Sequence, residues 1–149
     1  MKEKEQIQNE MRIKLPSLSV NESVARSVVA AFCAQLDPST SALADIKCVV
    51  SEAVTNCIVH GYKNEIGIIY IHVKIFEGAK ICICIKDKGC GISDIKKAME
   101  PLYTSSETGE RAGLGFSIME SFMDKIRVRS KPGKGTSVTL EKSIVSKGK

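Results

Sequence analysis

The chain has 149 residues, of which 43% are hydrophobic and 26% charged, a composition typical of one folded domain with a buried core. No apolar run is long enough to cross a bilayer and the polar start does not resemble a secretion signal, so we expect a cytoplasmic protein that binds no membrane. The net charge of +5 is spread along the chain without a basic stripe interleaved with aromatic residues, so direct nucleic-acid binding is not expected.

A strand and a helix are predicted at the start of the chain. Residues 1–10 are charged and are expected to fray, and residues 11–15 alternate apolar and polar side chains like a short edge strand. Ser19 or Asn21 can cap a first helix, which Asp37-Pro38 ends. Its predicted apolar stripe consists of Val24, Val28, Ala31, Phe32 and Leu36.

A long second helix is predicted from a cap at Ser39 to Ser41 to an end near Gly61. Its buried stripe is predicted to contain Leu43, Ile46, Val50, Ala53, Val54 and Cys57. Glu52 and Asn56 lie four residues apart beside this stripe, so both side chains project from one face. A carboxylate next to an amide oxygen suits a proton acceptor beside Mg²⁺, although such a pair is more often a solvated helix edge.

The second half of the chain is predicted to contain two hairpins separated by a polar segment and a helix. These elements are strands at 66–76 and 80–86, a short helical turn at 95–99, a polar segment at 101–112, a helix at 113–124, and strands at 126–130 and 137–140. The polar segment is either a mobile lid or a disordered loop. The helix is expected to present Ile118, Met119 and Phe122 as its apolar residues.

This succession of helices and hairpins predicts an α+β fold. We expect one domain over residues 1–149, with flexible ends at 1–10 and 143–149. The predicted architecture is a two-layer α/β sandwich, with a mixed, mainly antiparallel sheet and helices on one face.

The cysteines occur in apolar helix and strand patterns, with no C-x-x-C pair and no nearby histidine cluster. They are therefore interpreted as reduced, small apolar residues, and a structural zinc site or disulfides are not expected. Cys82 and Cys84 share one face of a strand, which is more often a core position than a chemical one. His60 and His72 are likewise interpreted as structural residues at a helix end and on a strand.

Glycine-rich turns mark two further candidate sites. Asp87 follows a buried strand and precedes Gly89 and Gly91, which remove side chains where another group must approach the backbone. Its carboxylate can accept a hydrogen bond from an amino group such as that of adenine, but Asp-x-Gly is also a common plain turn. The second site is the segment 111–117, where Arg111 and glycines at a helix start favour an anion, although such glycines also serve simple chain reversal.

The order of these motifs is more specific than any one of them. E-x-x-x-N on a helix, D-x-G-x-G after a strand, a polar segment, G-L-G-F at a helix start and G-K-G-T before a last strand together resemble the GHKL (Bergerat) ATP-binding fold. The stretches N-E-S-V-A-R, V-V-S-E-A-V-T-N, P-L-Y-T-S and G-L-G-F-S-I-M-E-S-F-M-D resemble one family in that superfamily, the sporulation anti-sigma F factors. The likeness extends over nearly the whole chain.

The resemblance implies a protein serine/threonine kinase that binds and inhibits the sigma F factor and phosphorylates an anti-anti-sigma protein. It implies ATP or ADP and Mg²⁺ as bound groups, and a homodimer, for which the edge strand at 11–15 offers a seam. Glu52 would be the general base and Arg26, otherwise an ordinary solvated arginine, would bind the partner proteins. The implied nucleotide-binding residues are Asn56 (also the Mg²⁺ ligand), Asp87, Gly89, Gly91, Thr104, Ser105, Arg111, Gly113, Leu114, Gly115 and Thr136.

Two alternatives stay open. The chain could be a nucleotide-gated anti-sigma binding module with little or no kinase activity, and Glu52 discriminates between the two because a binder needs no base there. A detached sensor-kinase ATPase domain acting on histidine or aspartate is the other, but no dimerisation helix pair precedes the ATP motifs. Cys90, between the two glycines of the Asp87 turn, departs from the small or apolar residue usual in the family.

Overall fold

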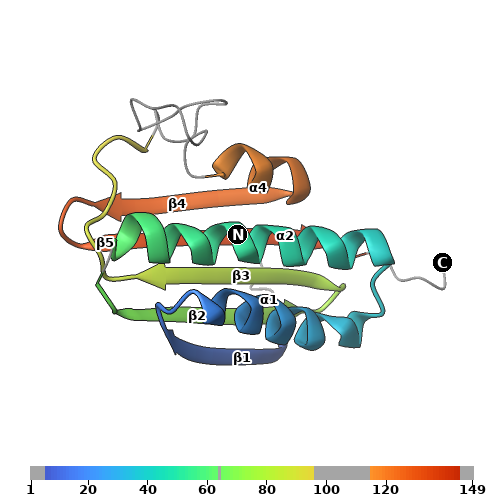
Figure 1. Cartoon of the computed structure of the whole chain (residues 1–149). Helices are drawn as coiled ribbons and strands as arrows, with labels where there is room; N and C mark the ends of the chain where they lie inside the picture. The colour runs from blue at the N-terminus through green and yellow to red at the C-terminus, as the bar shows by residue number, and fades with distance from the viewer. Residues whose placement is uncertain (1–5, 64, 96–114, 145–149) are drawn as a thin grey trace.

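The computed structural model describes residues 6–63, 65–95 and 115–144. They form a five-stranded sheet and a layer of helices (Figure 1). The elements are β1 (Ile7–Pro16), α1 (Val20–Cys33), a 3₁₀ turn (Ala34–Leu36), α2 (Thr40–Asn56), a π-helical turn (Cys57–Gly61), β2 (Ile68–Phe76), β3 (Lys80–Asp87), α4 (Phe116–Phe122), β4 (Lys125–Lys131) and β5 (Gly135–Ser143). The predicted succession of strands and longer helices is confirmed. The predicted helical turn at 95–99, apart from Ile95, and the polar segment at 101–112 lie outside the described residues.

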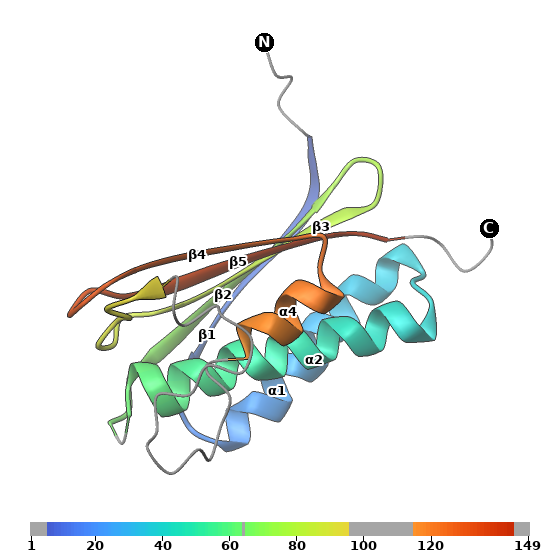
Figure 2. The same ribbon diagram turned by 90° about the horizontal axis from the view of Figure 1, so that it is seen from above.

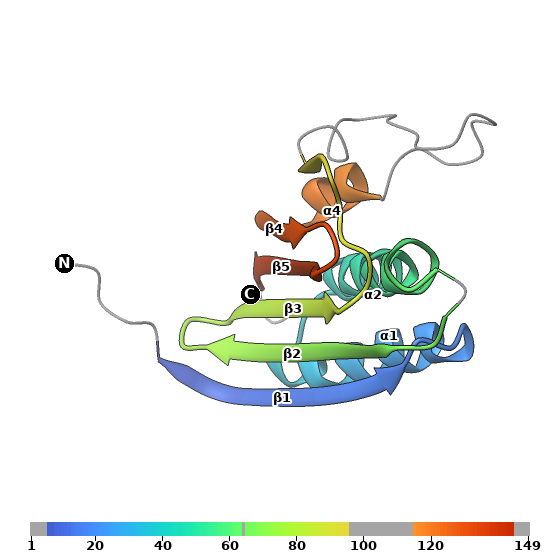
Figure 3. The ribbon, with the colours of Figure 1, turned by 90° about the vertical axis from the view of Figure 1, so that its left-hand side faces the viewer.

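The sheet has the strand order β1-β2-β3-β5-β4. The helices lie against one of its faces, as Figures 2 and 3 show from two directions. The predicted α+β sandwich with helices on one face is therefore confirmed. Every described pair of neighbouring strands is antiparallel, so the sheet is not mixed. Two hairpins, β2–β3 and β4–β5, meet through β3 and β5, and this junction is antiparallel as well.

The core is made by branched aliphatic side chains that alternate along the central strands. The inward residues of β2 and β3, all buried, are Ile69, Ile71, Val73, Ile75, Ile81, Ile83 and Ile85. Cys82 and Cys84 alternate with these isoleucines, so they lie on the opposite face of the sheet and are half-buried. The expectation that they belong to the core was wrong, because burying isoleucine removes more apolar surface from water than burying cysteine.

The buried side of α1 differs from the predicted stripe. Ala25 and Cys33 are fully buried, whereas Val24 is 40% exposed and Ala31 is also exposed. The fully buried positions lie one residue beyond the predicted ones, about 100° around the helix. Phe32 and Leu36 of the predicted stripe are partly buried against the core, as expected. Small side chains at Ala25 and Cys33 let α1 approach α2 closely, and this packing outweighs the larger apolar surface of Val24.

Two further elements differ in extent from the prediction. β1 begins at Ile7, four residues before the predicted strand, and it forms the edge of the sheet as expected. The predicted helix at 113–124 is observed as α4, which starts at Phe116. Phe116 and Met119 are buried there, but Ile118 is 40% exposed, so its assignment to the apolar face was wrong. In a helix this short, two core contacts already fix which side is buried.

Candidate functional site

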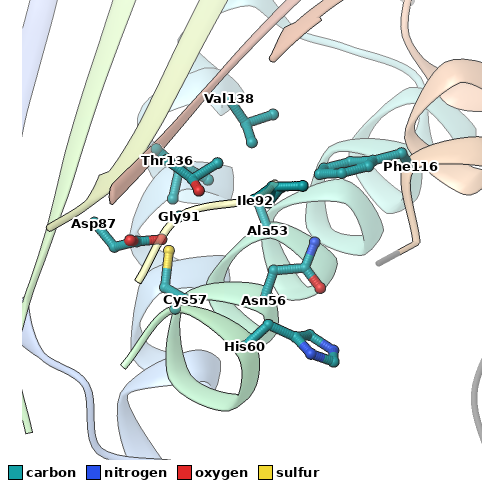
Figure 4. Close-up of a pocket in the computed structure, with 12 residues that line it drawn as sticks. Ala53, Asn56, Cys57, His60, Asp87, Gly91, Ile92, Phe116, Thr136 and Val138 are labelled. Atoms are coloured by element: carbon teal, nitrogen blue, oxygen red, sulfur yellow. The ribbon is translucent and has the colours of Figure 1, made fainter. Parts of the chain in front are cut away.

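A cavity lies at one end of the sandwich, between the sheet and the helical layer (Figure 4). Its wall comes from the end of α2, the π-helical turn, the segment after β3, the start of α4 and β5. The lining residues are Ala53, Asn56, Cys57, His60, Gly61, Ile85, Asp87, Gly91, Ile92, Phe116, Thr136 and Val138. The apolar members supply flat contact surface, and few polar groups interrupt it, as is usual for a small-molecule site.

The π-helical turn that follows α2 forms one side of the cavity. Asn56 ends the α-helical part and is 8% exposed, and Cys57–Gly61 continue the helix with wider turns. Such π turns are rare and are often found at functional sites. The helix therefore ends near Gly61 as predicted, and its last turn brings Asn56 and His60 to the same side of the cavity in Figure 4. His60, interpreted from the sequence as a structural residue only, is thus a cavity residue.

Asp87 is the most buried charged residue of the site, with 3% of its surface exposed. Burial raises the pKa of its carboxyl group, while hydrogen bonds from the Gly89 N–H (2.8 Å), the Cys57 thiol and the Thr136 backbone act in the opposite direction. A Cβ on Gly61 would lie 2.8 Å from the Asp87 carboxyl carbon, so glycine is required beside it. Donors from three segments thus hold this carboxylate in one orientation.

Thr136 belongs to a small hydroxyl network centred on Ser130. The Ser130 Oγ accepts from the Ile92 N–H at 2.7 Å, donates to the Gly135 carbonyl at 2.9 Å and lies 2.8 Å from Thr136 Oγ1. A hydroxyl has one proton to donate, so Thr136 donates to Ser130 if Ser130 donates to Gly135. The Thr136 oxygen then presents lone pairs only. Ser130 was not singled out from the sequence, where nothing distinguishes it from any other strand serine.

The loop after Asp87 packs against two other backbone segments. The Cys90 N–H donates to the Gly61 carbonyl at 2.9 Å, and the Gly133 N–H donates to the Cys90 carbonyl at 2.7 Å. A Cβ on Gly89 would overlap the Gly61 carbonyl, and one on Gly91 would overlap the Lys131 carbonyl. The close approach inferred from the two glycines is therefore made by the protein's own backbone, which fixes the loop around Asp87.

Glu52 lies one helical turn before Asn56, outside the cavity lining. Its carboxylate contacts the position that a Cβ of Gly115 would occupy, at the start of α4. Gly115 has φ +72°, a left-handed conformation that favours glycine. The predicted pair on α2 is thus split, with Asn56 in the cavity and Glu52 against the chain entering α4.

The other predicted site residues do not join this cluster in the described structure. Arg26 lies on α1, where it forms an ion pair of 3.2 Å with Glu22 of the same helix. Outside the described residues lie Thr104, Ser105, Arg111, Gly113 and Leu114. Among the residues that the structure covers, no group of three His, Cys, Asp or Glu side chains could hold a metal, and no helix is long and apolar enough to cross a membrane.

All six cysteines are described and none is in a disulfide, as expected. Cys57 is the one that the cavity contains, and its contact with Asp87 was not foreseen. The helical stripe predicted its burial correctly, but a stripe does not tell which strand end a buried thiol will meet. Phe116 and Val138 were missed for the same reason.

Comparison with known proteins gives consistent similarities. Residues 15–142 match the histidine kinase-like ATPase domain family. The anti-sigma F factor of Thermoanaerobacter sp. (strain X514) is 57% identical over 138 residues, which cover 93% of this chain and 96% of that protein. The anti-sigma F factor of Clostridium acetobutylicum is 48% identical, with the same coverage of both chains.

Solved structures share the fold at low sequence identity. A structure of the RsbU and RsbW domains of a Mycobacterium tuberculosis protein superposes with a TM-score of 0.65 at 19% identity, covering 92% of this chain and 33% of that one. The catalytic domain of the histidine kinase ThkA gives a TM-score of 0.56 at 17% identity and covers 92% and 97%. At these identities the likeness concerns the fold.

Proposed function

The chain belongs to the histidine kinase-like ATPase domain family and, within it, to the anti-sigma F factors, and from this premise we propose that it binds and inhibits sigma F and phosphorylates a serine of an anti-anti-sigma protein. The observation that carries the proposal is the cavity with buried Asp87 at one side and Asn56 at the other. Asp87 offers a hydrogen-bond acceptor for the adenine, and Asn56 offers an oxygen ligand for a metal ion near the phosphates. Glu52 lies one helical turn before Asn56.

The lining of the cavity suits an adenine ring, and its volume of about 30 Å³ requires the lining residues to move apart when the ring enters. Asp87 would accept a hydrogen bond from the adenine amino group, and the lone pairs of Thr136 would face a base donor. Ile92 and Phe116 line the same space and would cover the ring. Asp87 is already held by three donors, so its orientation costs little entropy when the nucleotide binds.

Mg²⁺ fits the donor set of this site when the phosphates complete it. The protein alone offers no cluster of three acidic, histidine or cysteine side chains among the described residues. Mg²⁺ needs no such cluster, because it commonly keeps waters and takes one or two protein oxygens beside substrate phosphates. Asn56 would supply that oxygen from the cavity wall, and the ion would neutralise phosphate charge.

Glu52 would act as the general base. Its carboxylate would take the proton of the substrate serine hydroxyl as that oxygen forms a bond to the γ-phosphorus and ADP leaves. Its contact with Gly115 places it beside the segment that enters α4. By family resemblance, Thr104, Ser105, Arg111, Gly113, Leu114 and Gly115 would surround the phosphates.

Partner binding would use a different part of the molecule. Arg26 is part-exposed on α1 and is not among the cavity residues, which suits a contact to sigma F or to the anti-anti-sigma protein. The strand β1 pairs with β2 only, so its other edge could join a second copy in the proposed homodimer.

Transfer of labelled γ-phosphate from Mg-ATP to the anti-anti-sigma protein of the same genome tests the kinase. We expect label on serine with the wild type, a loss of at least about a hundredfold with Glu52→Gln, and unchanged ATP binding. Glu120→Gln, on the exposed side of α4, is the matched control and should keep full transfer.

Two results would redirect the proposal. Absence of label from a protein that binds both ATP and sigma F would favour the alternative, a nucleotide-gated anti-sigma module that does not transfer phosphate. Acid-labile label on histidine or aspartate would instead point to the sensor-kinase type of chemistry.

A further inference from the structure

The face of the sheet opposite the helices is strongly basic. The helices lie against the other face (Figure 2), so no described element covers the outward side chains of the strands. Antiparallel register sets these side chains in rows that cross the sheet. From β1 to β4, one row is Lys14, Tyr70, Lys86, Ser137 and Arg129. The next row is Arg12, His72, Cys84, Thr139 and Arg127.

The first two rows of this basic face carry excess positive charge, whereas the row beyond them, Glu10, Lys74, Cys82, Glu141 and Lys125, carries two charges of each sign. The two rows contain five lysine or arginine side chains and neither aspartate nor glutamate. Lys88, Lys131 and Lys134 lie where the strands end beside the first row, and all eight cations are exposed. Of these eight, Arg12 alone has an ion pair with a described residue, at 3.5 Å from Glu10. A polyanion would find free cations over the whole width of the sheet.

A shallow groove runs along the basic face between β1 and β3. Its lining includes Arg12, Lys14, Tyr70, His72, Lys86 and Lys88. The ammonium groups of Lys14 and Lys88 lie 5.7 and 5.1 Å from the centre of the Tyr70 ring. β1 and β3 are two strand spacings apart, about 10 Å, which is room for a single extended strand but not for a duplex. Both lysines are exposed and can turn from the ring to a phosphate.

The chemistry of the face decides between kinds of partner. Protein interfaces have an apolar core in which lysine is depleted, and none of the large exposed apolar residues lies in the two rows. Membrane-surface binding likewise needs apolar side chains that enter the lipid. Nucleic-acid interfaces are polar and strongly positive, and single strands are held by a basic groove with aromatic rings.

We propose that this basic face binds single-stranded nucleic acid through its phosphates, with Tyr70 on the groove floor available for a base. His72, beside it, is held by Glu10, whose carboxylate lies 2.8 Å from the His72 Nε2. Contacts of this kind carry no sequence preference. The cations come from segments 12–14, 86–88 and 127–134, which explains why the sequence shows no basic stripe and led to the opposite expectation. The register of five strands joins them.

The test is fluorescence anisotropy of a labelled oligothymidylate of about 20 nucleotides at two salt concentrations. Replacing Lys14→Gln and Lys86→Gln together should raise the Kd about tenfold and lower the salt slope of binding by about 1.4. Lys47→Gln removes charge from the exposed side of α2, which lies on the other face of the sheet, and should leave both quantities unchanged. ATP binding, measured in parallel, should be unaffected in both variants.

Several outcomes would overturn the proposal. These are no saturable binding by the wild type, equal weakening in Lys47→Gln and in the double variant, tighter binding to a duplex of the same length, or binding to phosphatidylserine-containing vesicles without binding to the oligonucleotide. Circular dichroism checks the fold of each variant. If the Lys14 and Lys86 variant does not fold, Arg127→Gln with Arg129→Gln tests the same prediction from the other side of the sheet.

Discussion

Asp87 is a buried carboxylate that is proposed to accept a hydrogen bond from the adenine amino group. The residue is 3% exposed, and segments that surround it also donate hydrogen bonds to its carboxylate. Asp87→Asn keeps the shape but replaces one acceptor oxygen by a donor, which would face the adenine amino group. We expect ATP affinity to fall by about tenfold or more, measured by calorimetry. As a control, Asp45→Asn alters a carboxylate on α2, outside the cavity, and should bind ATP normally. If Asp87→Asn bound ATP as tightly as the wild type, Asp87 would not contact the adenine.

The same carboxyl group should make folding stability depend on pH. Burial raises the pKa of Asp87 in the folded protein, so the folded state binds more protons than the unfolded state between the ordinary value of 3.8 and the raised one. Its contribution to stability is therefore present below 3.8 and is lost as pH rises through the raised pKa. Urea unfolding of wild type and Asp87→Asn over this window measures it. As pH rises, the wild type should lose unfolding free energy relative to Asp87→Asn. A difference between the two proteins that stays constant with pH would contradict the raised pKa of Asp87.

Ser130 is expected to position the site without touching the reacting atoms. Ser130→Ala leaves the Ile92 N–H without its acceptor and removes the bond to Thr136, which should cost about 1–3 kcal/mol of unfolding free energy. ATP affinity should fall with it, since Ile92 and Thr136 both line the cavity. Ser121→Ala removes a serine that bonds only within α4 and should change stability by less than about 0.5 kcal/mol. Equal effects of the two substitutions would show that the Ser130 network is dispensable.

At the scale of elements, hydrophobic periodicity predicted well which helices and strands exist and in what order. It predicted less well which side of each element is buried. The stripe of α2 was correct from Ile46 onward because its isoleucine and valine residues recur over several turns, whereas Leu43 is not in the core and the buried Val49 was not predicted. In α1, Phe32 and Leu36 pack on the core as predicted, but the fully buried positions lie one residue further along. The packing of Ala25 and Cys33 depends on α2, which a pattern within α1 does not contain. Cys82 and Cys84 were expected in the core because they share one strand face, whereas the isoleucines that alternate with them occupy the core instead. Local pattern fixes an element, and its neighbours fix its orientation.

The start of α4 provides a test of how an element positions the proposed base. Gly115 and Gly133 have φ of +72° and +76°, so alanine at either costs about 1–2 kcal/mol of backbone strain. A Cβ on Gly133 meets no atom within 4 Å, but one on Gly115 meets the Glu52 carboxylate, the mobile end of a flexible side chain. Urea unfolding should therefore show similar losses for Gly115→Ala and Gly133→Ala. Phosphate transfer should fall in Gly115→Ala alone, because that Cβ displaces Glu52 and lies in the segment proposed to surround the phosphates. ATP binding measured in parallel separates the two effects, and equal transfer by both variants would contradict the placement of Glu52.

At the scale of the whole molecule, the fold brings residues that are far apart in the sequence to one cavity at the end of the sandwich. Asn56, Asp87 and Thr136 were identified individually from motifs, and the structure brings all three to one cavity. Their motif spacing carried that information only through family resemblance. The hydroxyl network of Ser130 and the basic rows have no linear signature, since they arise from the register between strands. Long-range pairing is what sequence patterns leave undetermined.

The rates at which the six free thiols are alkylated distinguish local opening of the structure from global unfolding. Burial raises the pKa of Cys33 to about 12 and that of Cys57 well above its ordinary value, so neither forms the reactive thiolate in the folded protein. Cys90 is exposed in the loop beside Asp87. With iodoacetamide at about pH 8, mass spectrometry should find Cys90 modified first, and Cys33 and Cys57 modified only when guanidinium unfolds the chain.

Alkylation of Cys90 should also weaken ATP binding, because its N–H and carbonyl fix the loop against Gly61 and Gly133, and a bulky group there strains both contacts. Cys90→Ser should bind ATP equally well before and after treatment. Modification of Cys57 at the rate of Cys90 would show that the cavity opens without global unfolding. In that case ATP should slow the labelling of Cys57 and leave Cys33 unchanged, because only Cys57 lines the cavity.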